Sequence, residues 1–406
     1  MNNIIAIGGG PSGIVAAIKA KNENNHVIVL EKNSSPLKKL LMTGNGKCNY
    51  FNEVYSTKNY HSKNIDIVNE IISDKNISKA KDFIDSIGII PKIKNGYYYP
   101  VSNQAITIKN ALLKEAELKG IEIICNSEVL DVQKENKFII KCTNKEYECD
   151  KLIIAMGSKA YPKTGSDGLG YKLLEEFGHT IIKPLPALVG LVSDFKYSKD
   201  LSGVRTDAYL ELFEDDKYLA SETGELQFTN YGISGICTFN LSNYVTRGLE
   251  EGRKEVIKVN LVPFIDTLIT PWLEKYSKEQ SGKNLTELLE GFLNYKIVNV
   301  ILKLSNLDGK RYYNDLTNKE KLILVKNLRS LKINITGTNS FENAQICNGG
   351  VSLEEINPET MESKIINDLY ITGELLDMNG NCGGYNLTTC WISGLLAGSD
   401  IGDRND

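Results

Sequence analysis

The segment that decides the fold is NIIAIGGGPSGIVAAIKA at residues 3–20, followed by HVIVLEK at residues 26–32. The apolar run at residues 3–7 predicts a buried strand, the small apolar residues after the glycines predict a helix, and residues 26–30 predict a second buried strand. Gly8, Gly10 and Gly13 have the spacing G-x-G-x-x-G, and Glu31 ends the second strand. This order of strand, glycine turn, helix, strand and acid predicts a dinucleotide-binding βαβ unit.

Each glycine of this turn has its own physical purpose. Gly8 allows the tight turn from strand to helix, Gly10 lets the backbone approach a pyrophosphate, and Gly13 lets the helix pack on the strand. The pyrophosphate would lie at the positive N-terminal end of the following helix. Glu31 would bond to the hydroxyls of the adenosine ribose, which disfavours a phosphate on that ribose. The unit therefore predicts FAD or NAD rather than NADP.

The composition bounds the size and the partners of the protein. A chain of 406 residues is long enough for two or three domains, because single cores rarely exceed about 250–300 residues. The formal net charge of −4 and the isoelectric point near 5.7 give no basic footprint for nucleic acid. With no signal-peptide pattern and no apolar stretch long enough for a bilayer, we expect a soluble cytoplasmic protein without membrane partners.

Metal and disulfide chemistry are not expected. No two cysteines are spaced as C-x-x-C, which disfavours a zinc ribbon and an adjacent redox disulfide. The three histidines are far apart in the sequence, so we predict no metal site. Most cysteines are expected to be small buried apolar residues in a reducing compartment. The residues concerned are Cys48, Cys125, Cys142, Cys149, Cys237, Cys347, Cys382 and Cys390, with His26, His61 and His179.

The pattern of apolar residues changes twice along the chain. A helix is predicted over residues 102–119, ending at Gly120, and short strands follow at residues 121–126, 128–133, 137–143, 146–149 and 152–155. After Pro186, strands are predicted at residues 208–213, 218–221, 226–229 and 256–262, with a helix at residues 234–249. The apolar residues of 266–331 recur at helical spacing, and a strand is expected at 332–336. A glycine-rich sequence typical of a cofactor-binding domain begins again at Gln345.

These changes predict an insertion within a domain that is built from both ends of the chain. We expect an α/β fold in which residues 1–187 and 344–406 form a Rossmann-like nucleotide-binding domain. Residues 188–265 and 332–343 would form an inserted β-rich domain. Residues 266–331 would be a helical insertion within it, either a lid or a dimer contact; the sequence does not decide the oligomeric state.

Two further segments favour FAD over NAD. Residues 43–49, TGNGKCN, could wrap a pyrophosphate and ribityl chain with backbone amides, while Lys47 offers a positive charge. Near the C-terminus, residues 370–374 predict a strand that ends in a glycine turn with an acid. Gly383 and Gly384 then precede a final helix that continues to about Leu396. A helix N-terminus that faces the flavin would stabilise the negative charge of its reduced form.

At these residues the sequence resembles the bacterial FAD flavoproteins that include bile-acid-reductase-like (BaiN-like) and aminoacetone-oxidase-like proteins, within the glutathione-reductase superfamily. The resemblance rests on residues 7–13, 39–49, 155–157, 165–170 and 372–386. It implies a fold of the two-dinucleotide-binding-domain type with an inserted β-barrel-like domain that carries a helical insertion. The chain departs from the family pattern at Leu37 and Lys38, which replace a glycine and an arginine, and at Lys47, which replaces an arginine. Since lysine lacks the planar fork of arginine, weaker cofactor affinity is expected.

The resemblance also implies a set of FAD contacts. Val129 would reach the adenine through its backbone, and the other residues would surround the pyrophosphate, ribose and flavin. The set is Gly8, Gly10, Pro11, Ser12, Gly13, Glu31, Lys32, Lys39, Gly46, Lys47, Cys48, Asn49, Val129, Gly157, Gly373, Glu374, Asp377, Gly384 and Asn386.

No catalytic residue is assigned, because the cofactor carries most of the chemistry of hydride transfer. A proton donor near flavin N5 would help. The candidates are Tyr97, Tyr98, Tyr99, Tyr161, Tyr385 and Cys382. For the three adjacent tyrosines the competing interpretation is ordinary strand packing. For Cys382 the competing interpretation is that it lies beside the flavin and is not a nucleophile.

The sequence contains no second G-x-G-x-x-G fingerprint, so a dedicated NAD(P)H domain is not expected. NADH or NADPH would then bind transiently at the flavin, or the enzyme would be an oxidase. We expect an FAD-dependent oxidoreductase that acts on a small molecule, either reducing an activated C=C bond with NAD(P)H or oxidising an amine. The alternatives are a flavin-binding regulator without turnover and a tRNA-modifying flavoenzyme, which the acidic isoelectric point disfavours.

Overall fold

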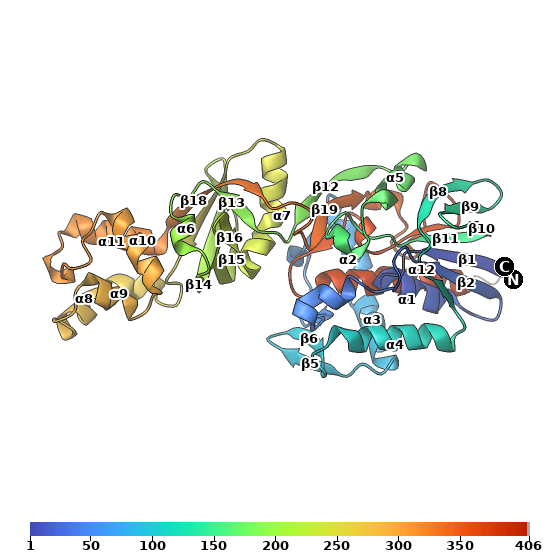
Figure 1. The fold of residues 1–406 in the computed structure, drawn as a ribbon, viewed down its shortest axis with the longest axis horizontal. Helices are drawn as coiled ribbons and strands as arrows, with labels where there is room; N and C mark the ends of the chain where they lie inside the picture. The colour runs from blue at the N-terminus through green and yellow to red at the C-terminus, as the bar shows by residue number, and fades with distance from the viewer. Residues whose placement is uncertain (404–406) are drawn as a thin grey trace. The chain divides into compact units, whose positions relative to one another are not determined.

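The computed structural model describes residues 1–403 of the chain. The backbone forms two compact units (Figure 1), which are described separately below. The first unit contains residues 1–185 and the described chain from Gln345 onward, and the second contains residues 186–344. The three-part division predicted from the sequence remains a prediction, because compactness alone does not define a domain.

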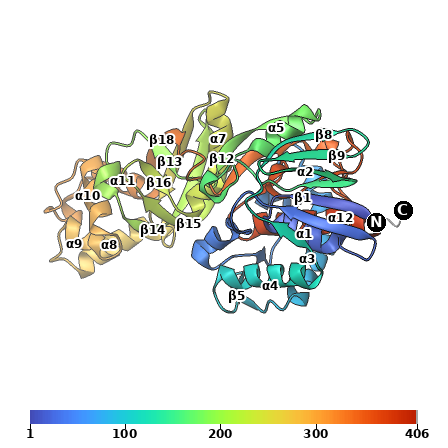
Figure 2. The same cartoon turned by 45° about the vertical axis from the view of Figure 1, so that its right-hand side comes forward.

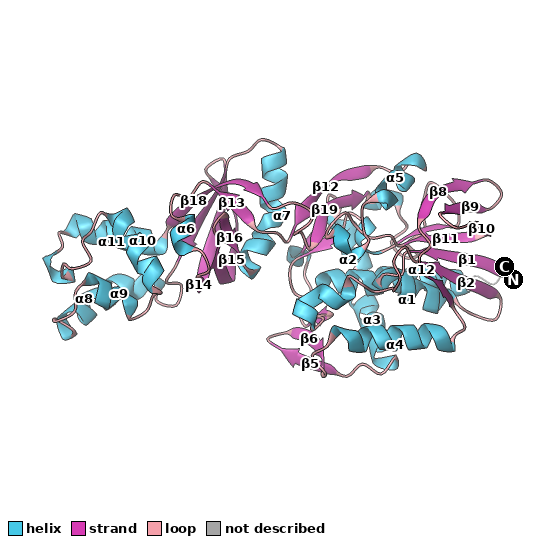
Figure 3. Cartoon of the chain, viewed as in Figure 1, coloured by secondary structure: helices cyan, strands magenta, loops and turns pink. Residues whose placement is uncertain are grey.

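The first unit is built on a parallel sheet of five strands in the order β20-β11-β1-β2-β7. Its central strand β1 (Asn2–Ile7) pairs with β2 (Asn25–Leu30) on one side and with β11 (Lys151–Ile154) on the other. The edge strands are β7 (Glu122–Ile124) and β20 (Leu369–Ile371). Figure 3 shows these strands with helices beside them, and the buried apolar residues of β1, β2 and β11 form the core.

The helix that follows β1 packs against the last helix of the described chain. These helices are α1 (Pro11–Ala20) and α12 (Tyr385–Asp403), and they lie side by side in Figures 1 and 2. A methyl group built on Gly394 would lie 2.6 Å from the carbonyl oxygen of Ser12. One built on Gly398 would lie 2.6 Å from Cβ of Lys19, and one on Gly402 would lie 2.8 Å from the carbonyl oxygen of Lys19. The two backbones therefore approach so closely that only glycine fits along this seam.

The remaining elements of the first unit surround the sheet. The helices are α2 (Ile65–Ile71), α3 (Asp74–Ser86), α4 (Ala105–Leu118) and α5 (Leu169–Glu176). One antiparallel sheet has the order β10-β9-β8, from β8 (Val129–Lys134), β9 (Phe138–Cys142) and β10 (Glu146–Cys149). Another has the order β3-β6-β5, from β3 (Phe51–Asn52), β5 (Pro91–Lys94) and β6 (Tyr97–Pro100). Two pairs complete the unit: β4 (Tyr60–His61) with β21 (Asn379–Gly380), and β12 (Ile181–Ala187) with β19 (Ile346–Val351).

The second unit contains a closed barrel, in agreement with the predicted fold class. Its strand order is β13-β16-β15-β14-β17-β18. The strands are β13 (Leu191–Ser193), β14 (Arg205–Glu214), β15 (Lys217–Phe228), β16 (Gly232–Ser234), β17 (Glu255–Asn260) and β18 (Leu331–Thr338). Helix α6 (Ser198–Leu201) lies before β14, and α7 (Ile236–Glu250) packs against β15.

The prediction of two separate strands at residues 218–221 and 226–229 is wrong. The structure has the single strand β15, whose middle residues pair with β14 through partners such as Ala208 and Gly224. The segment at residues 222–225 is poor in apolar side chains, which suggested a break. Backbone hydrogen bonds to β14 hold it in the barrel nevertheless, because a closed barrel leaves no unpaired edge.

Helices fill the span between β17 and β18. They are α8 (Ile269–Glu279), α9 (Leu285–Glu290), α10 (Tyr295–Ser305) and α11 (Asn318–Arg329). Helix α9 begins with a capping box of Asn284 and Glu287, and α11 begins with one of Thr317 and Glu320, so two backbone N–H groups are satisfied at each of these N-termini. The helical spacing predicted for residues 266–331 is thus present.

Two glutamates oppose each other at the end of the barrel. Glu255 pairs with Glu214 across the β14–β17 ladder, is 1% exposed, and leans with it against Gly248 of α7. Arg253 binds Glu214. Burial, followed by the charge of Glu214, raises the pKa of Glu255 from its ordinary value of 4.5 to about 7. Between these two pKa values, Glu255 is protonated in the folded state and ionised in the unfolded chain.

This pair predicts a pH dependence of stability. The contribution of Glu255 is fully present below its unfolded pKa and is lost as the pH rises through its folded pKa. We expect the free energy of unfolding to fall by roughly 2 kcal/mol between about pH 5 and about pH 8 because of this group. Urea titrations over that range, compared with Glu255→Gln, measure the effect. If the variant keeps the same slope, Glu255 is not the titrating group.

No helix within residues 1–403 combines the length and the apolar character that crossing a bilayer requires.

Candidate functional site

The carboxyl ends of four parallel strands meet at one edge of the first unit's sheet. Gly8 follows β1, Glu31 follows β2, Gly157 lies three residues beyond β11, and Gly373 lies two residues beyond β20. The chain leaves β1 toward β2 on one side and returns at β11 on the other. Ligands of open α/β sheets bind at such a switch point, outside the carboxyl ends of the strands. This edge therefore collects most of the residues predicted to hold the cofactor.

The three fingerprint glycines differ in what surrounds them. Gly8 has φ +107°, and a methyl group there would lie 2.8 Å from the carbonyl carbon of Ala155. A methyl group on Gly13 would overlap the carbonyl oxygen of Gly8. A methyl group on Gly10 would meet nothing within 4 Å, and Gly10 lies at the N-terminus of α1. The turn is tight where the backbone requires it and open where a phosphate group would approach.

Glu31 is held by the turn that it faces. Its Oε2 accepts from the N–H of Gly9 at 2.8 Å, and its Oε1 accepts from the backbone and side-chain N–H groups of Asn33, each at 2.7 Å. The carboxylate is buried and fixed beside the glycine turn, with accepting capacity left for a further donor. The neighbouring Lys32 instead forms exposed ion pairs with Glu128 at 2.8 Å and Asp167 at 2.6 Å.

A backbone hydrogen bond just before Val129 ties the start of β8 to the end of β2. The N–H of Ser127 donates to the carbonyl oxygen of Glu31 at 2.9 Å, and β8 begins two residues later at Val129, whose side chain is buried. The role of the Val129 backbone at the adenine stays a prediction.

The loop at residues 37–49 is shaped by left-handed residues. Gly44, Asn45, Gly46 and Cys48 have φ values of +55°, +54°, +81° and +59°. A methyl group on Gly46 would have a single neighbour, the carbonyl oxygen of Leu41 at 3.9 Å, so the loop is open there. Lys47 is exposed. The loop thus exposes backbone groups and the Lys47 ammonium, with few large side chains around Gly46.

Lys39 and Glu374 join this loop to the C-terminal segment. Lys39 Nζ lies 2.6 Å from Glu374 Oε2, which also accepts from Ser158 Oγ at 2.8 Å. The carbonyl oxygen of Glu374 accepts from the Tyr171 hydroxyl at 3.3 Å. Gly157, with φ +73°, precedes Ser158, and Ser166 Oγ donates to the carbonyl oxygen of Ser158. Segments that follow β2, β11 and β20 are therefore tied together at the site.

The C-terminal residues pack directly on the start of α1. A methyl group on Gly373 would overlap Ser12 Oγ, and the N–H of Gly373 donates to Ser393 Oγ at 3.0 Å. Further along, Asp377 is buried and its Oδ2 accepts from the N–H of Lys63 at 2.8 Å and from the Ser62 hydroxyl at 3.2 Å. The C-terminal segment is thus anchored to two parts of the chain that are distant in sequence.

The start of α12 is organised by Gly384 and Asn386. Gly384 has φ +90°, and a methyl group there would lie 2.6 Å from the carbonyl oxygen of Phe51. The side chain of Asn386 bonds to both the N–H and the carbonyl oxygen of Gly380, each at 2.8 Å. Asn386 therefore shapes the loop before α12, rather than leaving its amide available for a ligand.

Buried polar atoms without partners mark the same region. Asn49 Oδ1, Thr372 Oγ1 and Asn379 Oδ1 are three of the buried side-chain atoms in both units that lack a hydrogen bond among the described residues. A buried polar group that lacks a partner costs about 1–3 kcal/mol, so such atoms call for a ligand or water. Together with the open position at Gly10, they fit a long, polar dinucleotide such as FAD.

Two of the candidate proton donors meet beside Cys382: a methyl group built on Gly383 would lie 3.0 Å from Cε1 of Tyr97 and 3.1 Å from Cε2 of Tyr385. Tyr385 donates its hydroxyl to the carbonyl oxygen of Val54 at 3.0 Å, and its ring packs on Tyr55 and Tyr60. The Tyr98 ring contacts Tyr50 and Phe51 edge-on. These contacts hold the Tyr385 and Tyr98 side chains in place within the first unit. Tyr97, Tyr99, Tyr161 and Cys382 are each partly exposed.

Cys48 is buried in the site loop and has no disulfide partner. Burial raises the pKa of its thiol to about 12, although Thr43 opposes the shift. A thiol that stays protonated is a poor nucleophile, so Cys48 is a packing residue in the free protein. All eight cysteines are free, and no cluster of three or more metal-ligating side chains occurs within residues 1–403.

Several residues that position the site were not identified from the sequence. Asn33 fixes Glu31, Ser158 binds Glu374, and Ser393 binds the backbone of Gly373. Asn33 lies two residues after the acid and could have been suspected from that spacing. Ser158 and Ser393 carry no comparable signal, because their partners are 216 and 20 residues away in the sequence.

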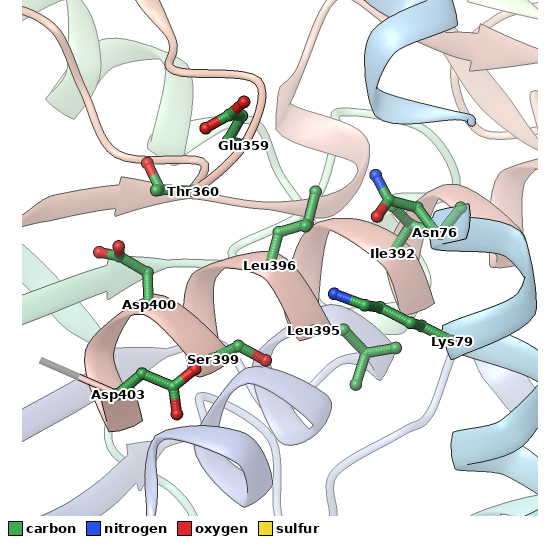
Figure 4. A pocket seen from close by; sticks show the side chains of 10 residues that line it. All are labelled: Asn76, Lys79, Glu359, Thr360, Ile392, Leu395, Leu396, Ser399, Asp400 and Asp403. Atoms are coloured by element: carbon green, nitrogen blue, oxygen red, sulfur yellow. The ribbon is translucent and has the colours of Figure 1, made fainter. Parts of the chain in front are cut away.

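A cavity of about 340 Å³ opens elsewhere in the first unit, between α3 and α12 (Figure 4). Leu395 and Leu396 give it an apolar floor, and Lys79, Asp400 and Asp403 lie around it. None of the residues predicted to bind the cofactor lines it. The complete lining is Asn76, Lys79, Glu359, Thr360, Ile392, Leu395, Leu396, Ser399, Asp400 and Asp403. This cavity is separate from the cofactor site.

The family of the chain follows from its match to known sequences. The profile described as the HI0933-like protein Rossmann domain matches residues 2–400. The chain belongs to this family. Because the family is one of FAD oxidoreductases, the chain is an FAD-dependent oxidoreductase, as the βαβ unit and the resemblance predicted.

Relatives with assigned activities cover the full length of this HI0933-like chain. It is 36% identical to 3-dehydro-bile acid delta(4,6)-reductase of Clostridium scindens, over 100% of both chains. It is 26% identical to ribosomal RNA dihydrouridine synthase of Escherichia coli, over 98% of this chain and 97% of that protein. The first similarity bears out the predicted kinship with the bile-acid-reductase-like proteins.

Solved structures of low sequence identity share the fold of this chain. A 3-ketosteroid delta1-dehydrogenase from Sterolibacterium denitrificans matches with a TM-score of 0.51 and 9% identity, over 100% of both chains. The open conformation of a flavocytochrome c3 fumarate reductase matches with a TM-score of 0.50 and 13% identity, over 99% of this chain and 78% of that one. At these identities the likeness shows the fold alone, and it confirms the predicted fold class.

Proposed function

We propose that this HI0933-like protein reduces a C=C bond conjugated to a carbonyl group in a small, rigid organic substrate. The observation that carries the proposal is the identity of 36% over full length with a reductase whose name specifies ring double bonds of an oxidised bile acid. The bound FAD, once reduced by NADH or NADPH, would supply a hydride to one carbon of the double bond, and the other carbon would take a proton from water. A steroid enone is the substrate class that this similarity favours, and amine oxidation has no comparable support.

The cofactor would be held by the residues gathered at the carboxyl edge of the sheet. Gly10, Pro11 and Ser12 at the start of α1 would receive the pyrophosphate, and Glu31 would face the adenosine ribose. The loop at residues 44–49 and the start of α12 would enclose the flavin. The remaining residues proposed to form the cofactor site, by contact or by positioning its backbone, are Gly8, Gly13, Lys32, Lys39, Gly46, Lys47, Cys48, Asn49, Val129, Gly157, Gly373, Glu374, Asp377, Gly384 and Asn386.

The contacts of this set suggest different roles within it. Lys39 and Glu374 would act as a pair that fixes the two loops relative to each other, because their atoms are 2.6 Å apart. Lys32, in exposed ion pairs, and Asn386, bonded to Gly380, would support neighbouring backbone rather than touch the cofactor directly. We retain residues 1–187 and 344–406 as the proposed FAD domain, and the barrel with its helices as the inserted domains.

NADH or NADPH is the proposed electron donor and would bind transiently, since the sequence has one dinucleotide fingerprint. A cytoplasmic location is also proposed, because eight free cysteines suit a reducing compartment.

A second candidate substrate is uridine in RNA, which the similarity to ribosomal RNA dihydrouridine synthases favours. The reaction would again be reduction of a C=C bond next to a carbonyl. The net charge of −4 is unfavourable for binding a polyanion. A small molecule is therefore the preferred candidate substrate, and RNA is included as a second substrate in the experiment below.

Anaerobic stopped-flow absorbance measures both halves of the proposed reaction. NADH, NADPH or an amine is mixed with the oxidised holoenzyme, and loss of the visible flavin absorbance reports reduction. The reduced enzyme is then mixed with a steroid enone, the corresponding saturated ketone as control, or a uridine-containing RNA. We expect the enone alone to restore the oxidised spectrum. Reoxidation by RNA alone would favour the second candidate, and bleaching by amines would favour an oxidase. No response to any of these would favour a regulator.

A further inference from the structure

The hairpin of β5 and β6 presents one face made of alternating tyrosines and lysines. In the antiparallel register, Lys92 lies opposite Tyr99 and Lys94 lies opposite Tyr97. Directly opposed residues share one face of a sheet, and their side chains are neighbours. Asn52 of β3 lies opposite Tyr97 on the other side and extends the same row. These five residues, Asn52, Lys92, Lys94, Tyr97 and Tyr99, are called the hairpin face below.

The opposite face of the hairpin fixes it to the first unit. Tyr98 packs its ring against Tyr50 and Phe51, with centroid distances of 6.3 and 6.2 Å. Lys81 Nζ lies 5.0 Å from the centroid of the Tyr98 ring. Because one side is anchored, the hairpin face is held in a defined position rather than on a loose loop.

The hairpin face adjoins two of the segments proposed to enclose the flavin. A methyl group built on Gly383 would lie 3.0 Å from Cε1 of Tyr97, and Asn52 Nδ2 donates to the carbonyl oxygen of Gly383 at 2.9 Å. A methyl group built on Gly44 would lie 3.7 Å from Cε1 of Tyr99. Both tyrosine rings therefore touch the glycine-rich walls of the cofactor site, and both are only half-buried.

The lysines extend the hairpin face away from those walls. Lys92 and Lys94 are exposed, and within residues 1–403 neither forms an ion pair. Lys47, on the loop that also carries Gly44, adds a third exposed cation. Apolar rings next to the cofactor and cations farther out match a ligand that has a flat or rigid body and an anionic group at its far end.

We propose that the hairpin face is the substrate-binding surface, and that it selects a rigid enone bearing a carboxylate. Tyr97 and Tyr99 would contact the ring body, and Lys92 and Lys94 would bind the carboxylate. This inference rests on the proposed function and adds to it the residues that would bind the ring body and the carboxylate of the substrate. A small carboxylate suits two or three lysines on a protein of net charge −4, whereas RNA binding relies on many phosphate contacts.

The test measures binding to the oxidised holoenzyme by the perturbation of the flavin spectrum. The probes are a steroid enone with a side-chain carboxylate and its neutral methyl ester. We expect the acid to bind about tenfold more tightly than the ester, a preference that weakens with added salt. The double variant Lys92→Gln/Lys94→Gln should abolish the preference, and the matched variant Lys75→Gln/Lys119→Gln, at exposed lysines on other elements, should keep it. Tyr97→Leu and Tyr99→Leu should weaken both probes alike, by about tenfold.

Equal affinities for acid and ester, unchanged by the lysine substitutions, would overturn the inference. So would a uridine-containing RNA hairpin that competes with the acid and binds more tightly than it. The outcome is separable from that of the proposed function. If the reduced enzyme converts the ester but shows no preference for the acid, the function stands and the inference fails. If the acid binds through the lysines and is not reduced, the inference about binding stands and the function fails.

Discussion

Replacing Gly10 by alanine is expected to leave a folded protein that has lost about 99% of its affinity for FAD, a change of about 2.7 kcal/mol. The backbone of Gly10, with φ −79° and ψ 178°, is one that alanine adopts without strain. The added methyl group meets no protein atom within 4 Å, so the fold has no reason to change. It points instead into the space at the N-terminus of α1 that a pyrophosphate would need. Isothermal titration of the apo protein with FAD, beside thermal unfolding of the apo protein, measures both effects.

Gly13, three residues further along α1, is expected to give a contrasting result. Gly13→Ala would place its methyl group on the carbonyl oxygen of Gly8, so this variant should lower the stability of the apo protein as well as FAD binding. Gly282→Ala, at a position with equally open surroundings in the second unit, should change neither quantity. FAD affinity of Gly10→Ala equal to that of the unaltered protein would show that the pyrophosphate does not approach Gly10.

Replacing Gly398 by alanine is expected to lower the free energy of unfolding by about 3 kcal/mol. The sign is the informative part, because glycine to alanine inside a helix ordinarily stabilises by about 1 kcal/mol. Here the methyl group would lie 2.6 Å from Cβ of Lys19 and closer still to the carbonyl oxygen of Ala16. Both atoms belong to α1, whose backbone is confined between the sheet and α12, so the helices must separate. Urea unfolding of the apo protein, followed by circular dichroism, gives the value.

The controls for Gly398→Ala add the same methyl group without a clash. Gly10→Ala and Gly282→Ala should retain the stability of the unaltered apo protein. Because Ser12 lies on the same seam beside Gly373, loosening α12 should also weaken FAD binding. A Gly398→Ala protein as stable as the unaltered chain would mean that α1 and α12 are not in backbone contact.

The fold was predictable where local pattern and long-range packing agree. Residues 3–32 predicted β1, α1 and β2, because the glycine turn and the apolar periodicity are both local signals. The last helix was expected to end near Leu396 and continues to Asp403. Gly398 and Gly402 lower its intrinsic helix propensity, and packing on α1 compensates. Helices α2 and α3 were not predicted, although α3 has Ile77, Ala80 and Ile84 on its buried face.

The candidate site was predictable in its parts but not in its internal contacts. The glycine motifs and Glu31 lie in short segments with recognisable spacing. The pair Lys39–Glu374 joins residues 335 positions apart, and Asn52 meets Gly383 across 331 positions. Such contacts depend on the tertiary packing of the first unit, which the spacing of residues within a short segment does not reveal. The role of Tyr385 in particular needed the structure, because its hydroxyl bonds the backbone of Val54, 331 positions away.

The glycine seam between α1 and α12 has a consequence for biosynthesis. The second unit is one continuous segment, so it can complete its own folding while the ribosome is still translating the rest of the chain. The first unit holds its earliest helix against its latest, and β20 enters the sheet beside β11 only after residue 371 has been made. Non-local contacts of this kind slow folding and leave apolar strands exposed in the interim. We therefore expect the nascent βαβ segment to stay incompletely packed until the final helix has been made and can pack on α1.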